Sequence, residues 1–242
     1  MEKPQLAAYV SPMDMSRSVP DFRHIDTWLF DLDNTLYRAD SNLFAEIESR
    51  MNEFIMRELK ISEIEAQALR SQYYRSYGST LSGLIAHYQI DPEKFLHYVH
   101  DIDLSSLKPD PDLQEAIARL PGKHYVFTNG CRNHAARVLE KTGLAKLMDG
   151  VWDIRSMRYQ PKPQPEAYSR IVEDGGFDPA KTAYFEDMAI NLLPAHEMGM
   201  TTVWIANGSV WSDQGPDANL TNHNHVHHTI DDLGDFLQTI RV

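Results

Sequence analysis

Short apolar segments alternate with helical patterns along most of this chain, and that alternation limits the folds it can adopt. Each apolar segment is four to six residues long, is rich in β-branched or aromatic residues, and is bounded by Gly, Pro, Asn or Asp, as buried strands are. Strands separated by helices favour a parallel sheet with helices on both faces, an α/β fold. The predicted strands are residues 27–30, 124–129, 150–154, 182–186 and 201–206, with a final strand after the polar, His-rich loop 222–228.

Helical periodicity fills the segments that follow three of these strands. Each segment repeats apolar residues at a spacing of three and four, and each reaches a glycine that favours the end of a helix. These segments are residues 133–143, 165–176 and 190–199, with expected ends at Gly143, Gly175 and Gly199.

The region between the first and second predicted strands breaks the alternation. From residue 39 to 103 there is no convincing strand pattern, whereas apolar residues recur at helical spacing from residue 43 to 55. Ser62 followed by Glu65 forms a capping box, which marks a helix start. We therefore expect an inserted helical subdomain. The predicted organisation is an N-terminal arm at 1–24, a core at 25–37 and 105–242, and a helical cap at 38–104.

Composition excludes several classes of function. The 242 residues carry a net charge of −12, which disfavours binding to nucleic acid polymers or anionic membranes, since both need a basic face. No apolar run approaches the ~18 residues of a membrane span. The lone cysteine, Cys131, allows no disulfide within the chain and is expected to pack rather than react. We expect a cytoplasmic protein; its oligomeric state is left open.

Polar residues gather where the predicted strands end. Each has an ordinary structural explanation by itself, because acids and Asn favour turns and caps, a lone lysine is usually solvated, and a threonine can simply end a strand. Their shared position is more informative, because the carboxyl ends of parallel strands meet at one edge of a sheet, where ligands bind. These residues are Asp31, Asp33, Thr128, Asn129, Gly130, Lys162, Glu186, Asp187 and Asn191.

Together these side chains could carry out phosphoryl transfer. A carboxylate can attack phosphorus and form an aspartyl phosphate. Because the carboxylate and the phosphate are both anionic, a cation must lie between them, and Mg²⁺ prefers oxygen ligands such as Asp31 and Asp187. Thr128 and the backbone amides up to Gly130 could hold phosphoryl oxygens, and Lys162 could supply positive charge.

Four segments in order, "FDLDNTLY", "FTNG", "PKPQPEAY" and "FEDMAIN", resemble the motifs of the haloacid dehalogenase-like superfamily. The resemblance covers nearly all of the chain after residue 24 and implies a Rossmann-like doubly wound sheet with a helical cap. It also implies that Asp31 is the nucleophile and that Asp33 is the general acid and base, with its backbone carbonyl on the metal.

The same resemblance implies roles for the other strand-end residues. Thr128 would bind phosphate and Lys162 would steady charge, while Asp187 and Glu186 would join Asp31 around Mg²⁺ and Asn191 would orient that shell. Many relatives have two aspartates followed by serine where this chain has Glu-Asp-Met. Because a glutamate side chain is longer than an aspartate side chain, Glu186 is expected to contact the metal differently.

The text "YYRSYGSTLSGL" in the cap, together with "FTNGCRNHA", resembles more closely the pyrimidine 5′-nucleotidase branch of that superfamily. This resemblance implies that Tyr74, Tyr77 and Gly78 lie near the substrate, with Asn129, Gly130 and Arg132 on its phosphate side. Packing between cap helices is the alternative for the tyrosines, which lie at helical spacing.

The sequence thus predicts a Mg²⁺-dependent phosphomonoesterase that acts on a small phosphorylated metabolite, with a pyrimidine nucleoside 5′-monophosphate as the leading substrate. A phosphatase for a sugar phosphate and a phosphomutase are the alternatives with the same core. A haloacid dehalogenase is disfavoured, because halide displacement needs no acid at Asp33. A catalytically silent binding protein is disfavoured by the intact acids and lysine.

Overall fold

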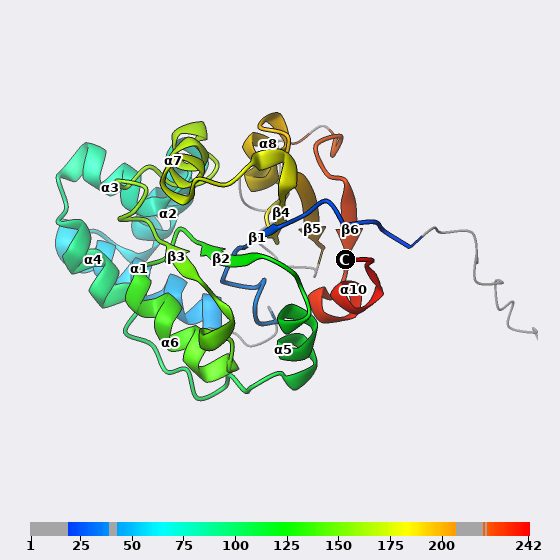
Figure 1. The fold of residues 1–242 in the computed structure, drawn as a ribbon. Helices are drawn as coiled ribbons and strands as arrows, with labels where there is room; N and C mark the ends of the chain where they lie inside the picture. Colours follow the sequence, from blue (N-terminus) through cyan, green and yellow to red (C-terminus); the bar gives the residue numbers. More distant parts are fainter. Residues whose placement is uncertain (1–18, 39–42, 207–219, 221) are drawn as a thin grey trace, which may run out of the picture.

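The computed structural model describes residues 19–38, 43–206, 220 and 222–242. Its centre is a six-stranded sheet, in which all neighbouring strands pair in parallel in the order β3-β2-β1-β4-β5-β6 (Figure 1). The predicted α/β class is therefore confirmed. The strands are β1 (Thr27–Phe30), β2 (Lys123–Phe127), β3 (Gly150–Trp152), β4 (Thr182–Glu186), β5 (Thr201–Ile205) and β6 (His228–Ile230).

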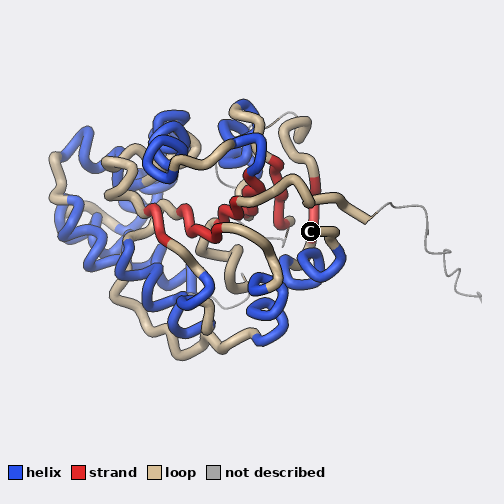
Figure 2. The backbone as a smooth tube through the Cα atoms, in the orientation of Figure 1, coloured by secondary structure: helices blue, strands red, loops and turns tan. Residues whose placement is uncertain are grey.

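Helices cover both faces of this sheet, as Figures 1 and 2 show. Side chains alternate between the faces, so Trp28 and Phe30 of β1 join one buried cluster and Leu29 joins the other. One face is covered by α5 (Pro111–Ala118), α6 (Arg132–Thr142) and α10 (Leu233–Thr239), and the other by α7 (Pro165–Gly175) and α8 (Ala189–Glu197).

Several element boundaries differ from the sequence predictions. The strand predicted at 124–129 ends at Phe127, which places Thr128 and Asn129 in the loop beyond the sheet edge. Helix α7 includes Gly175 as its last residue, and the glycine that caps it is the next one, Gly176, whose φ of +62° is left-handed. Helix α5 was not predicted, although Asp110 caps its first turn and Pro111 begins it.

The predicted helical insertion is present between β1 and α5. No strand occurs between residues 43 and 104, and the capping box forms, because Ser62 and Glu65 each bond the other's backbone amide. The insertion packs on the same buried cluster as α7 and α8, through side chains such as Phe54 and Phe95. Its helices are α1 (Leu43–Leu59), α2 (Glu63–Tyr77), α3 (Thr80–Tyr88) and α4 (Pro92–Val99).

The predicted N-terminal arm lies mostly outside the described residues, which begin at residue 19. Its last part packs on the core, since Phe22 is buried and its backbone amide donates to the carbonyl of Arg241 at 2.8 Å. Across the part of the chain that the structure describes, every helix is too short or too polar to cross a bilayer.

Candidate active site

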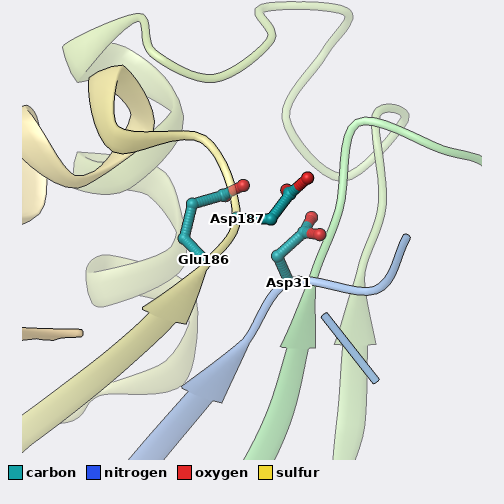
Figure 3. Close-up of side chains that lie close together, drawn as sticks. All are labelled: Asp31, Glu186 and Asp187. Carbon is teal, nitrogen blue, oxygen red and sulfur yellow. The ribbon is translucent and has the colours of Figure 1, made fainter. Parts of the chain in front are cut away.

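The carboxyl ends of β1 and β4 bring three acids together. Asp31 directly follows β1, while Glu186 is the last residue of β4 and Asp187 comes next (Figure 3). The two strands are neighbours in parallel register, with Phe30 opposite Phe185. All three carboxylates are buried, and one oxygen from each lies within 4.8 Å of the others. The convergence predicted from the sheet is thus present.

Lys162 pairs with two acids of this cluster and is only 1% exposed. Its Nζ donates to Oδ1 of Asp31 and to Oε2 of Glu186, both at 2.6 Å. It also donates to the backbone carbonyl of Phe127 and to the hydroxyl of Tyr184, each at 2.9 Å. The ammonium is therefore held at a fixed point between two carboxylates, where it offsets part of their charge.

Asn129 fixes the loop that carries Lys162. Its side-chain amide donates to the backbone carbonyl of Lys162 at 3.1 Å, and its side-chain oxygen accepts from the backbone amide of Lys162 at 2.8 Å. This pair of bonds ties the end of β2 to the loop before α7. Asn129 also lines the cavity described below, so its position serves both the loop and the site.

The acid cluster carries more negative charge than Lys162 can balance. Burial, reinforced by the charge of Glu186, raises the pKa of Asp31 to about 7, even though Lys162 acts in the opposite direction. Burial and the same glutamate raise the pKa of Asp187 well above its ordinary value. Three converging carboxylate oxygens with this unmet demand for positive charge fit a hard divalent cation, which takes oxygen ligands.

Asp33 has a different environment from Asp31. Its Oδ1 accepts a hydrogen bond from the hydroxyl of Tyr37 at 2.6 Å and another from Nε2 of His134 at 2.8 Å. Burial acts to raise the pKa of Asp33, but His134 and then Tyr37 outweigh it and hold this pKa below its ordinary value. No local motif links Asp33 to a histidine 101 residues away, so the sequence alone indicates a site role for neither donor.

The loop after β2 forms the next part of the site. The Thr128 hydroxyl oxygen accepts from the backbone amide of Gly130 at 2.9 Å, and Thr128 is almost fully buried. A Cβ on Gly130 would lie 3.2 Å from that hydroxyl oxygen, so a side chain here would crowd the loop. Thr128, Asn129 and Gly130 all line one cavity with Asp31 and Asp33.

This cavity lies between the sheet edge and the helical insertion. Lys162, Glu186, Asp187 and Asn191 complete its core side. The insertion contributes a mainly apolar and aromatic wall with one arginine. That wall includes Phe44, Met51, Arg70, Tyr74, Phe95 and His100.

Two residues expected near a substrate lie elsewhere. The Tyr77 hydroxyl is 2.6 Å from Nε2 of His87, within the insertion. The exposed guanidinium of Arg132 donates to the backbone carbonyl of Val151 at 2.8 Å. Neither residue lines the cavity, whereas Tyr74 and Gly78 from the same stretch of sequence do.

Solved structures of diverse chemistry share this fold. A haloacid dehalogenase-like phosphatase from Thermococcus onnurineus superposes with a TM-score of 0.57 at 19% identity, covering 90% of this chain and 100% of that one. The L-2-haloacid dehalogenase from Xanthobacter autotrophicus superposes with a TM-score of 0.54 at 16% identity, covering 88% and 97%. At these identities the similarity establishes the fold and not the reaction.

Similarity in sequence, unlike the similarity in fold, is high enough to identify a family. Phosphate metabolism protein 8 from Saccharomyces cerevisiae is 32% identical over 191 residues, which cover 72% of this chain and 59% of that protein. The chain thus spans less than two thirds of the length of this curated relative. The family model described as haloacid dehalogenase-like hydrolase matches residues 28–205, which include all four motifs. This chain therefore belongs to the haloacid dehalogenase-like hydrolase family.

Proposed function

We propose that this protein is a Mg²⁺-dependent phosphomonoesterase that forms an aspartyl phosphate on Asp31. The observation that carries this proposal is the environment of Asp31. Its carboxylate lies at the sheet edge, paired with Lys162 at 2.6 Å and clustered with Glu186 and Asp187. A nucleophilic carboxylate that must approach an anionic phosphate needs positive charge beside it, which Lys162 supplies in part and a cation at the three carboxylates would complete.

The residues take separate roles in the two steps. Asp31 attacks phosphorus while the bond to the leaving oxygen breaks, and the protonated form of Asp33 gives that oxygen a proton. Asp33 then removes a proton from water as the water attacks the aspartyl phosphate, which frees phosphate and regenerates Asp31. The Thr128 hydroxyl, whose oxygen accepts from the Gly130 amide, lines the cavity where it could donate to a phosphoryl oxygen.

Asp31, Asp187, Glu186 and the backbone carbonyl of Asp33 are the proposed ligands of Mg²⁺, with Asn191 beside them. When bound, the ion would offset the negative charge shared by the carboxylates and the phosphate. Lys162 balances part of this charge through its contacts with Asp31 and Glu186.

We assign residues 38–104 the role of a cap, because its helices supply one wall of the cavity and the sheet edge supplies the other. The aromatic side chains of Phe44, Tyr74 and Phe95, with Arg70 among them, suit a leaving group that has a flat ring and polar edges. A pyrimidine nucleoside 5′-monophosphate has this chemistry, and the name of the yeast relative refers to phosphate metabolism.

The test is phosphate release from UMP, CMP, purine nucleotides and sugar phosphates, with and without Mg²⁺. We expect the highest kcat/KM with UMP or CMP, and loss of turnover in Asp31→Asn. Asp149→Asn is the matched control, because Asp149 is an acid that pairs with Lys123 outside the cavity. Release of no phosphate from any of these substrates would refute the proposal, and a preference for sugar phosphates would overturn the nucleotide assignment alone.

A further inference from the structure

Both hydrogen bonds to the Asp33 carboxylate go to the same oxygen. Tyr37, in the turn after β1, and His134, on α6, both donate to Oδ1 at 2.6 and 2.8 Å. Both donors are buried, and the side chain of His134 has no exposed surface. Two groups from separate elements therefore fix the rotation of this carboxylate.

The other carboxylate oxygen of Asp33, Oδ2, lies near the cavity. Among the residues that the structure describes, none donates a hydrogen bond to Oδ2. A Cβ built on Gly130, a cavity-lining residue, would lie 3.7 Å from Oδ2, so this oxygen faces the loop where the phosphate is proposed to bind.

The imidazole of His134 is itself held in place. Because an ionised carboxylate only accepts hydrogen bonds, Nε2 is the donating nitrogen. Nδ1 is buried and has no partner in the described part of the chain, so one hydrogen bond and packing orient the ring. The packing comes from His100, whose ring lies 4.6 Å away and is tilted by 22°. His100 is anchored in turn by its Nδ1, 3.0 Å from the carbonyl of Leu96.

We infer that His134 and Tyr37 are positioning residues that occupy Oδ1 of Asp33 and so reserve Oδ2 for proton exchange with the leaving group and with water. This inference rests on the proposed phosphatase reaction. With both donors on Oδ1, a proton on the neutral acid has its place on Oδ2, because Oδ1 already accepts two hydrogen bonds. Neither residue touches the reacting atoms; each acts through Asp33.

Each step then has a defined route for its proton. In the first step, the bond between Asp31 and phosphorus forms as the bond from phosphorus to the leaving oxygen breaks. The electron pair of the broken bond stays on that oxygen, which takes the proton from Oδ2. In the second step, water bonds to phosphorus and gives a proton back to Oδ2, while the bond to Asp31 breaks with its electron pair returning to that carboxylate.

The test compares two leaving groups in three variants. One substrate is the best nucleotide or sugar phosphate from the panel above, which is an alkyl ester whose leaving oxygen needs a proton. The other is p-nitrophenyl phosphate, whose nitrophenolate leaves readily without being protonated. His134→Leu and Tyr37→Phe remove one donor each, while His134→Gln keeps a donating nitrogen. Thermal melting and circular dichroism check that each variant folds.

We expect His134→Leu to lower kcat/KM for the alkyl ester by roughly 10²-fold, as for a misplaced catalytic group, while kcat/KM for p-nitrophenyl phosphate changes little. Tyr37→Phe should show the same selectivity, and His134→Gln should recover part of the loss. Equal losses with both substrates, or no loss with either, would overturn the inference. A wild-type protein that hydrolyses neither ester would instead refute the proposed function, so the two failures differ.

Discussion

At the scale of single residues, Lys162 carries the charge balance of the site. Its ammonium is the donor shared by Asp31 and Glu186, and it is buried with both of them. Burial acts to lower the pKa of Lys162, but the two carboxylates outweigh it and hold this pKa above its ordinary value. The Lys162 side chain is therefore positively charged at neutral pH.

Lys162→Met should therefore reduce stability as well as activity. Removing one partner of a buried ion pair leaves uncompensated charge, and such losses cost about 3–5 kcal/mol. The control is Lys123→Met, which breaks an exposed pair with Asp149 and should cost less than about 1 kcal/mol. Urea unfolding measures both free energies. Equal stability of the two variants would contradict this description of the buried pair.

At the scale of elements, the end of helix α2 contacts the loop that carries Lys162. Gly78 follows α2 with a left-handed φ of +76°, and a Cβ there would lie 2.9 Å from the backbone carbonyl of Lys162. Gln164 of that loop donates to the carbonyl of Tyr77 at 3.2 Å. The helical insertion and the lysine loop are therefore packed backbone to backbone beside the cavity.

Gly78→Ala should disturb this contact, and Gly176→Ala is its matched control. Both glycines end a helix with positive φ, so both substitutions carry the strain of a left-handed alanine, about 1 kcal/mol. Only Gly78 has close neighbours, since nothing lies within 4 Å of a Cβ on Gly176. We expect Gly78→Ala to lose more stability and also kcat/KM, which Gly176→Ala should retain. The same kcat/KM in both variants would mean that this packing does not affect the site.

At the scale of the whole molecule, metal binding should stabilise the folded protein by an amount that depends on pH. The pKa of Asp31 is about 7 in the metal-free fold and 3.8 in its ordinary state. The folded state therefore holds this proton more tightly than the unfolded chain does, and the stability of the metal-free protein falls as the pH rises between these values. A cation at the carboxylates would remove this penalty.

Mg²⁺ should consequently raise the melting temperature, and by more at pH 8 than at pH 6, because the ion competes with the proton. At a concentration 100 times its Kd, the gain is about 2.7 kcal/mol, or roughly 5–11 °C for a chain of this size. Calorimetric melting at both values of pH measures the shift. Asp187→Asn should abolish it and Asp149→Asn should keep it; a shift independent of pH or of Asp187 would contradict the assigned ligands.

The sequence predicted the parts of this molecule that repeat a local pattern. Strand and helix periodicity led to the parallel sheet and the helical insertion, and the rule for strand ends brought Asp31, Lys162 and Asp187 to one edge. Contacts that depend on tertiary packing could not be read in this way. The bond from His134 to Asp33 joins residues 101 positions apart, and no spacing rule links them.

The location of Arg132 shows the same limit at a smaller scale. The resemblance to the pyrimidine 5′-nucleotidase branch implied a place for Arg132 beside the phosphate, but α6 begins at this residue and the guanidinium donates to the carbonyl of Val151. The direction of one side chain at the start of a helix depends on the neighbouring strand, which the local sequence does not specify. The missed helix α5 differs, because the Asp110 and Pro111 start signals were present in the sequence.

The central claim is that Asp31 becomes phosphorylated during turnover. The direct measurement is to quench the protein with acid during hydrolysis of its best substrate, reduce the mixture with borohydride, and sequence the peptides by mass spectrometry. An aspartyl phosphate is reduced to homoserine, so the account predicts homoserine at position 31, and none there when Mg²⁺ or substrate is left out. Steady release of phosphate with position 31 unmodified, or with homoserine at Asp33 or Asp187 instead, would contradict it.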